Sequence, residues 1–215
     1  MGNQRVDVII PFYNQKDFLV RCLSSIQVQT ILDDINVTII DDCSDENIDD
    51  IIAFFKRFLN INVLHLNRNK GPGYARQLGI DITSAPYICF IDADDIFENA
   101  YAVEYMRGLM LVNKKRPAVF TSFVEECSDG RKIPHVKDNT WIFGKIYSRE
   151  FLNENKIVFS DSRENEDKGF NCAVMLAHRK IQIMESVLKT ALLILGSGMK
   201  NLLQEKTILI IATEI

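Results

Sequence analysis

Short apolar runs alternate along the first half of the chain with segments whose apolar residues recur every three or four positions. The runs are rich in valine, isoleucine and aromatic residues, and they predict buried strands at 6–10, 36–40, 62–66 and 87–91. The segments between them have the period of amphipathic helices, at about 16–29, 47–59 and 73–83. This alternation predicts an α/β fold with a mostly parallel central sheet flanked by helices.

The second half of the chain has a more mixed pattern. A helix is predicted at about 99–114, one strand at 118–126, a turn at Ser128-Asp129-Gly130 and a mixed α+β stretch to residue 160. Aromatic residues end at Phe170, and the final segment differs in character from the rest. Apolar residues keep helical spacing from Met184 to a glycine-rich stop at 196–198, and 207–212 is strand-like.

Polar residues gather where the predicted strands end. Asn14 follows the first strand, Asp41 and Asp42 follow the second, residues 67–70 follow the third and residues 92–95 follow the fourth. The carboxyl ends of parallel strands meet at one edge of a sheet, where open α/β folds bind their ligands. The pattern therefore predicts a ligand site at this edge.

Composition narrows the class of protein. The content of 47% hydrophobic and 25% charged residues is typical of a soluble globular protein, and the net charge of −4 argues against nucleic acid as a partner. The five cysteines are far apart and contain no C-x-x-C pair, which argues against a disulfide framework and a zinc site and fits a reducing cytoplasm. No apolar run reaches the length of a membrane span.

Three aspartates end the fourth predicted strand, in the sequence Asp92-Ala-Asp94-Asp95. Two carboxylates at positions i and i+2 can turn toward one ligand, and hard oxygen donors suit Mg²⁺ or Mn²⁺ together with substrate phosphates. Capping of the next helix by solvated acids is an equally favoured interpretation.

Two further motifs have a chemical and a structural interpretation. Asp41 and Asp42 could accept hydrogen bonds from a nucleobase or a ribose, and the glycine-rich entry to the helix at 73–83 could face a phosphate, with Arg76 adding positive charge. A glycine-proline turn with a solvated arginine explains the latter stretch about as well. Glu164, Glu166 and Asp167 either complement a helix dipole or supply a general base.

The ordered motifs VDVIIPFYN, TIIDDCSD, NKGPGYARQLGI, YICFIDADD and ENED resemble those of the nucleotide-sugar-dependent glycosyltransferases of family 2 over about residues 5–180. The resemblance implies a GT-A-like, Rossmann-related nucleotide-binding domain. It divides the chain into a donor-binding half at 1–98, an acceptor-binding and catalytic half at 99–180, and an atypical tail at 181–215. The family usually has asparagine where this chain has Gln77.

The resemblance also implies roles for individual residues. It implies that Asp92 and Asp94 hold a divalent metal, with Asp95 as adjacent support, and that Asp167, with its neighbour Glu166, is the catalytic base. The residues that it places at the nucleotide are Pro11, Tyr13, Asn14, Asp41, Asp42 and Arg76.

The activity implied by the resemblance is inverting transfer of one sugar from a nucleotide donor, expected to be a uridine diphosphate sugar, with Mn²⁺ or Mg²⁺. The acceptor is expected to be a glycan or a lipid-linked molecule of cell-surface polysaccharide synthesis, and the location is expected to be cytoplasmic. The apolar tail at 181–215 is interpreted as an ordinary packed helix, with contact to a membrane surface or a partner protein as the alternative.

Two other classes of function remain open. The tail lacks the elements that relatives carry after the Glu-Asp motif, so a truncated or altered C-terminus is expected, and a nucleotide-sugar-binding remnant without turnover would have such a sequence. A nucleotidyltransferase is less favoured, because PFYNQ stands where a glycine-rich basic loop would follow the first strand. Hydrolysis of the donor separates an enzyme from a binder, and release of pyrophosphate would identify a nucleotidyltransferase.

Overall fold

The computed structural model describes residues 4–113, 115–127, 129–136, 138–160 and 164–194, with side chains in the last range described to residue 186. The chain divides into two compact units, Met1–Val174 and Met175–Ile215. The expected functional halves at 1–98 and 99–180 remain predictions.

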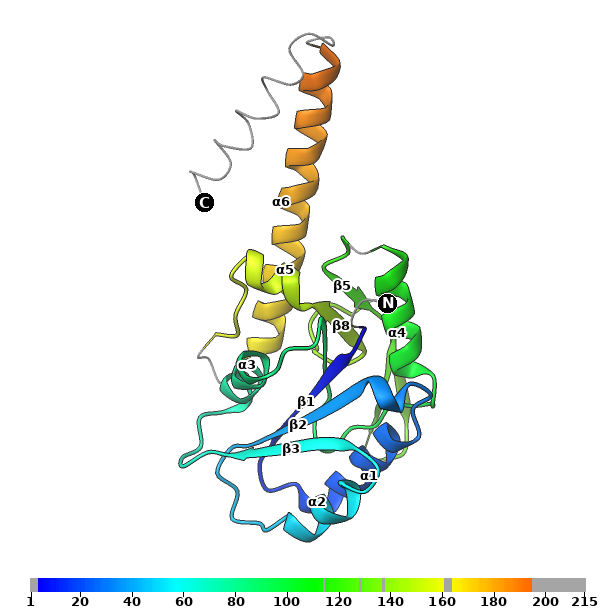
Figure 1. Cartoon of the computed structure of the whole chain (residues 1–215), viewed down its shortest axis with the longest axis vertical. Coiled ribbons are helices and arrows are strands. Elements are labelled where there is room, and N and C mark those ends of the chain that lie inside the picture. The colour runs from blue at the N-terminus through cyan, green and yellow to red at the C-terminus, as the bar shows by residue number, and fades with distance from the viewer. Residues whose placement is uncertain (1–3, 114, 128, 137, 161–163, 195–215) are drawn as a thin grey trace. The chain divides into compact units, whose positions relative to one another are not determined.

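A six-stranded sheet forms the centre of the first unit (Figure 1). Its order is β3-β2-β1-β4-β8-β5, and the first four of these strands are mutually parallel. β8 is antiparallel to both β4 and β5, so the sheet is mixed at one edge. The strands are β1 (Val6–Phe12), β2 (Ile35–Asp41), β3 (Asn60–His65), β4 (Tyr87–Phe90), β5 (Ala118–Phe120) and β8 (Lys145–Ser148).

Helices cover both faces of this sheet (Figure 1). Alternate β1 residues such as Val8 and Ile10 pack in one core cluster with α1 (Lys16–Gln27), α2 (Asp49–Phe55) and α4 (Ala102–Val112). The opposite face, which presents Ile9 of β1, packs against α3. The helices on that side are α3 (Pro72–Ile82), α5 (Arg149–Glu154) and the first turns of α6 (Glu166–Ile194).

The predicted strands and helices of the first half are confirmed, with boundaries that differ by a few residues. The prediction of one strand at 118–126 is wrong, because β5 ends at Phe120 and a separate strand, β6 (Phe123–Glu126), pairs with β7 (Lys132–His135). Between them, the backbone N–H and the hydroxyl of Thr121 both donate to the carbonyl of Gly144 at 2.8 Å. These bonds extend the β5–β8 pairing by one residue, and the chain then continues into the separate β6-β7 sheet. A hydrophobic pattern cannot reveal this change of partner.

Other expectations have mixed outcomes. All five cysteines are free, as expected. The helical spacing after Met184 is confirmed as far as Ile194, where α6 ends, but the predicted stop at 196–198 and strand at 207–212 lie outside the described residues. None of the helices in the described ranges is long and apolar enough to cross a membrane.

Close packing of α3 on β1 depends on Gly79. A Cβ atom at this position would lie 2.4 Å from Cγ2 of the fully buried Ile9. We expect Gly79→Ala to lower the free energy of unfolding by about 1–3 kcal/mol, because neither β1 nor α3 can withdraw without disturbing the sheet. Urea denaturation of the full chain measures the change.

Gly108→Ala is the matched control, because Gly108 lies inside α4 and a Cβ atom there would meet nothing within 4 Å. It should raise stability by up to about 1 kcal/mol through helix propensity. Equal effects of the two substitutions would show that the close contact with Ile9 does not limit the packing of α3.

Candidate functional site

A pocket of about 710 Å³ lies at the carboxyl ends of β1, β2 and β4, beside the N-terminus of α3. This is the edge at which the sequence predicts a ligand site. Five of the predicted site residues line it: Pro11, Tyr13, Asp42, Asp92 and Asp94. The remaining lining residues are Phe12, Gln15, Asn69, Gly71 and Pro72.

Asp42 shapes the wall of the pocket next to α3. It is buried, and its two carboxylate oxygens accept hydrogen bonds from the backbone N–H groups of Lys70 and Gly71, each at 2.7 Å. Gly71 has φ of +90°, a conformation that glycine adopts without strain, and Pro72 then begins the helix. The buried carboxylate thus fixes the loop from which the N-terminus of α3 faces the pocket.

Asp41 and Asn14 hold the neighbouring loops and are not among the lining residues. Asp41 is buried and binds the ring nitrogen Nδ1 of His65 at 2.7 Å and the backbone N–H of Ser44 at 2.9 Å. Asn14 has a positive φ, and its side chain accepts a hydrogen bond from the N–H of Asp45. Both residues therefore tie the loops after β1, β2 and β3 together.

Arg76 joins three carboxylates beneath the pocket. Arg76 is only 2% exposed, and its guanidinium lies 2.7 Å from Asp92, 3.0 Å from Glu166 and 2.6 Å from Asp167. The place near the nucleotide that the resemblance implies for Arg76 remains a prediction. These contacts show that its guanidinium lies between the end of β4 and the start of α6. It therefore links the Asp92–Asp95 turn to the Glu-Asp motif, which lies 71 to 75 positions later in the chain.

The same contacts control ionisation. Burial, with smaller effects of the charges of Asp92 and Glu166, raises the pKa of Asp167 to about 6 against the opposing effect of Arg76. Burial disfavours the charged guanidinium, but the carboxylates of Asp92, Asp167 and Glu166 outweigh this effect, and the pKa of Arg76 is raised. A carboxylate with a pKa close to neutral pH is well suited to act as a general base.

Packing fixes the start of α6, which carries Glu166 and Asp167. Phe170 stacks on Phe159 with 4.1 Å between ring centroids, and both contact Phe90 of β4. The next residue, Asn171, accepts a hydrogen bond from the Tyr147 hydroxyl at 2.6 Å. This aromatic cluster holds the first turns of α6 against the sheet, so the positions of the two acids follow from core packing.

The loop before β8 contacts Asp167 directly. The backbone N–H of Ile142 donates to Oδ2 of Asp167 at 3.2 Å. Fully buried Lys145 donates to the carbonyls on either side of Ile142, those of Trp141 and Phe143. Burial lowers the pKa of Lys145 to about 8. The loop is therefore held in the conformation that presents its N–H group to the acid.

Asp92 and Asp94 could supply oxygens to a divalent cation. Asp92 uses one carboxylate oxygen on Arg76, and Asp94 is exposed, with no side-chain hydrogen bond within the described ranges. Two carboxylates fit Mg²⁺ or Mn²⁺, which usually retain waters and bind substrate phosphates as well. In the part of the chain that the structure describes, no group of three or more His, Cys, Asp or Glu side chains could hold a metal ion without such a substrate.

Asp95 belongs to the same turn as Asp92 and Asp94 but lines a different pocket. Burial and the charges of Asp92 and Asp94 raise its pKa to about 7.

The bridging role of Arg76 and the support from Lys145 were not predicted from the sequence. Arg76 lies on the same buried face of α3 as Gly73, Ala75 and Gly79. The signal in the sequence that could have indicated a buried ion pair was this one charged residue on a helix face of small residues. A Cβ atom at Gly73 would lie 3.1 Å from Cγ of Glu166, so the glycine permits close contact between α3 and the Glu166 side chain.

Comparison with known proteins places this site in a family. The model of glycosyl transferase family 2 matches residues 7–174. A poly(ribitol-phosphate) β-glucosyltransferase from Bacillus spizizenii is 26% identical over 198 residues, which cover 83% of this chain and 31% of that protein. An uncharacterized glycosyltransferase from Rickettsia bellii is 40% identical over 97 residues, which cover 45% of this chain and 14% of that protein. The chain thus spans less than a third of these relatives.

Solved structures show the same fold. TarS residues 1–349 from S. aureus, in complex with UDP-GlcNAc, matches with a TM-score of 0.71 and 22% identity, covering 80% of this chain and 54% of that one. A mannosyltransferase from Pyrobaculum calidifontis, in complex with GDP-Man and Mn²⁺, matches with a TM-score of 0.61 and 16% identity, covering 76% and 50%. The expected GT-A fold is confirmed. Because the family model spans the sheet and the start of α6, the chain belongs to glycosyl transferase family 2.

Proposed function

We propose that the chain transfers one sugar, with inversion at the anomeric carbon, from a uridine diphosphate sugar to a hydroxyl group of a glycan or lipid-linked acceptor. The observation that carries this proposal is the salt-bridge network in which Arg76 joins Asp92, at the pocket, to Asp167, whose pKa is raised. Asp167, which is suited to remove a proton, is thus linked through Arg76 to Asp92, which is suited to hold a metal ion against a leaving diphosphate.

The pocket offers suitable partners for each part of the donor. The N-terminus of α3, beyond Gly71, favours the negative diphosphate, and Tyr13 is 47% exposed and can pack against a base or a ribose. Asp42 retains acceptor capacity for a base or ribose, because each carboxylate oxygen can accept more than one hydrogen bond. The UDP-GlcNAc complex of TarS supports a uridine nucleotide.

In the proposed reaction, Asp167 takes the proton of the acceptor hydroxyl as the oxygen attacks the anomeric carbon. The bond between that carbon and the diphosphate oxygen breaks, and its electron pair leaves with uridine diphosphate. The N–H of Ile142 and the guanidinium of Arg76 hold the two oxygens of Asp167 in place. Such positioning aligns the base with the reacting hydroxyl, and general base catalysis contributes about 10²–10⁴-fold to rates.

We propose that Asp92 and Asp94 hold Mn²⁺ or Mg²⁺ against the diphosphate. The cation would neutralise negative charge that develops on the leaving group. The Mn²⁺ complex of the Pyrobaculum mannosyltransferase supports this assignment. We also propose a cytoplasmic location and a role in cell-surface polysaccharide synthesis, supported by the similarity to a poly(ribitol-phosphate) β-glucosyltransferase.

Calorimetric titration of uridine diphosphate, with and without Mn²⁺, tests the donor site. We expect Mn²⁺ to increase the affinity of the wild-type chain and Asp94→Asn to abolish that increase, because the substitution removes a charged metal ligand. Asp17→Asn, an exposed aspartate in α1 outside the pocket, is the charge-matched control and should bind like wild type. Affinity that is independent of both Mn²⁺ and Asp94 would contradict the metal site.

Asp167→Asn tests the base. We expect transfer or donor hydrolysis to fall by about 10²–10⁴-fold, while binding of uridine diphosphate is retained. In the wild-type chain, kcat/KM should fall as the pH drops through about 6, since Asp167 must be ionised to accept a proton. A rate that stays constant from pH 7.5 to pH 5, or an active Asp167→Asn chain, would exclude Asp167 as the base.

Arg76→Lys tests the bridge, because lysine keeps the charge but cannot reach three carboxylates with one planar group. We expect a loss of about 3 kcal/mol in the free energy of unfolding and at least a tenfold loss in kcat/KM. Arg107→Lys is the control, since within the described residues Arg107 pairs with a single carboxylate, that of the half-exposed Asp34. It should change stability by less than about 1 kcal/mol. Equal effects would show that the three-way bridge has no special role.

A further inference from the structure

A second pocket, of about 770 Å³, shares the Asp92–Asp95 turn with the donor pocket. Asp92 and Asp94 line the first pocket, whereas Asp95 lines the second. The N–H of Asp95 donates to the carbonyl of Asp92 at 3.0 Å, so one tight turn forms part of both walls. A ligand in the second pocket would therefore lie within a few residues of the proposed diphosphate site.

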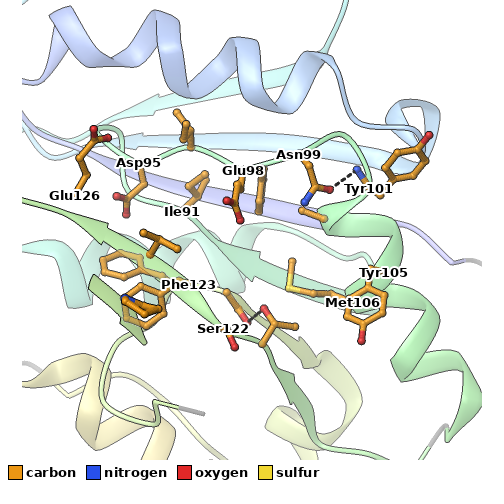
Figure 2. Close-up of a pocket in the computed structure, with 18 of the residues that line it drawn as sticks. Ile91, Asp95, Glu98, Asn99, Tyr101, Tyr105, Met106, Ser122, Phe123 and Glu126 are labelled. Atoms are coloured by element: carbon orange, nitrogen blue, oxygen red, sulfur yellow. Dashed lines mark hydrogen bonds between the residues drawn. The ribbon is translucent and has the colours of Figure 1, made fainter. Parts of the chain in front are cut away.

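Aromatic side chains open onto this second pocket (Figure 2). Tyr101, the residue before α4, and Tyr105, in the first turns of α4, line this site and are 64% and 62% exposed. Phe123 of β6 and Phe143 contribute further rings. Tyrosine combines a flat apolar ring with a polar hydroxyl, which suits the apolar C–H faces and the hydroxyl groups of a sugar.

The charged groups in the pocket are mainly acidic. Asp95, Glu98 and Glu126 line it, against Lys132 as the basic residue. Figure 2 shows Asp95 and Glu98 extending from the turn toward the strand that carries Phe123. Glu98 and Glu126 are exposed, and their carboxylates make no hydrogen bond within the described ranges. Free carboxylates can accept hydrogen bonds from sugar hydroxyls, but they repel a phosphate-bearing ligand.

We infer that this second pocket binds a neutral carbohydrate as the acceptor, and that its acidic residues select against phosphate-bearing acceptors. The inference rests on the proposed function, since it assigns the acceptor of the same reaction. Glu98 and Glu126 accept hydroxyl hydrogens, Tyr101 and Tyr105 pack against the ring faces, and the shared turn places the acceptor beside the donor.

Binding measurements on the full chain test this inference without requiring turnover. The probes are neutral oligosaccharides, with cellobiose and maltotriose as the first two, and poly(ribitol phosphate), each measured by saturation-transfer NMR in the presence of uridine diphosphate. We expect at least one neutral probe to bind and poly(ribitol phosphate) not to bind. Binding of the polyanion alone, or of none of the probes, would overturn the inference.

Substitutions then assign the binding to this pocket. The double variant Glu98→Gln, Glu126→Gln should lower the affinity for the neutral probe by about tenfold. The double variant Glu98→Lys, Glu126→Lys should bind poly(ribitol phosphate). Glu125→Gln is the matched control, because Glu125 precedes Glu126 in β6 but binds His135 and does not line the pocket. Neutral binding that both double variants leave unchanged would also overturn the inference.

Titration of uridine diphosphate separates this inference from the proposed function. The double variants should bind the nucleotide like wild type, since neither glutamate lines the donor pocket. If the chain binds the nucleotide but none of the neutral sugars, the proposed function stands and only the assignment of the acceptor is contradicted. If the chain binds a neutral sugar through Glu98 and Glu126 but does not bind the nucleotide, the proposed function is contradicted instead.

Discussion

The buried guanidinium of Arg76 is the constraint on which the site depends. A charge that is 2% exposed must be compensated, and three carboxylates from two distant segments do so. Removing one partner of a buried ion pair typically costs about 3–5 kcal/mol, so the end of β4 and the start of α6 cannot separate easily. The same attraction keeps Asp167 close to ionisation while burial raises its pKa, and stability and reactivity thus share one set of contacts.

The fold brings Arg76 to this position through close packing of α3. Gly79 lets the helix approach Ile9 of β1, and Gly73 leaves room for Glu166. From the other side, the stacked rings of Phe159 and Phe170 hold α6 against β4. Two small residues on one helix and one aromatic cluster therefore set the separation between the turn at Asp92 and the acid at Asp167. Local packing, rather than flexible loops, determines the geometry of the proposed reaction.

The sequence predicts the parallel part of the sheet well, because each of its strands is a distinct apolar run followed by polar residues. Polar residues at strand ends also predicted the pocket that contains Asp42, Asp92 and Asp94. The interior of the site could not be predicted, since Arg76 is buried only through contacts with residues far along the chain. The break between β5 and β6 likewise depends on pairing with other segments, since β5 pairs with β8 and β6 pairs with β7. The second pocket was not predicted either, because its lining residues come from several segments between Phe90 and Gly144 that share no short sequence motif.

The most direct test of the proposed single displacement is the configuration of the first product. The full chain would be incubated with UDP-glucose, whose sugar is α-linked, and with Mn²⁺, while proton NMR follows the anomeric signals from the earliest minutes. With water or an added sugar as acceptor, attack assisted by Asp167 predicts that the β-configured product appears first, before spontaneous mutarotation of any free sugar. Initial formation of the α-configured product would contradict a single displacement and the role given to Asp167.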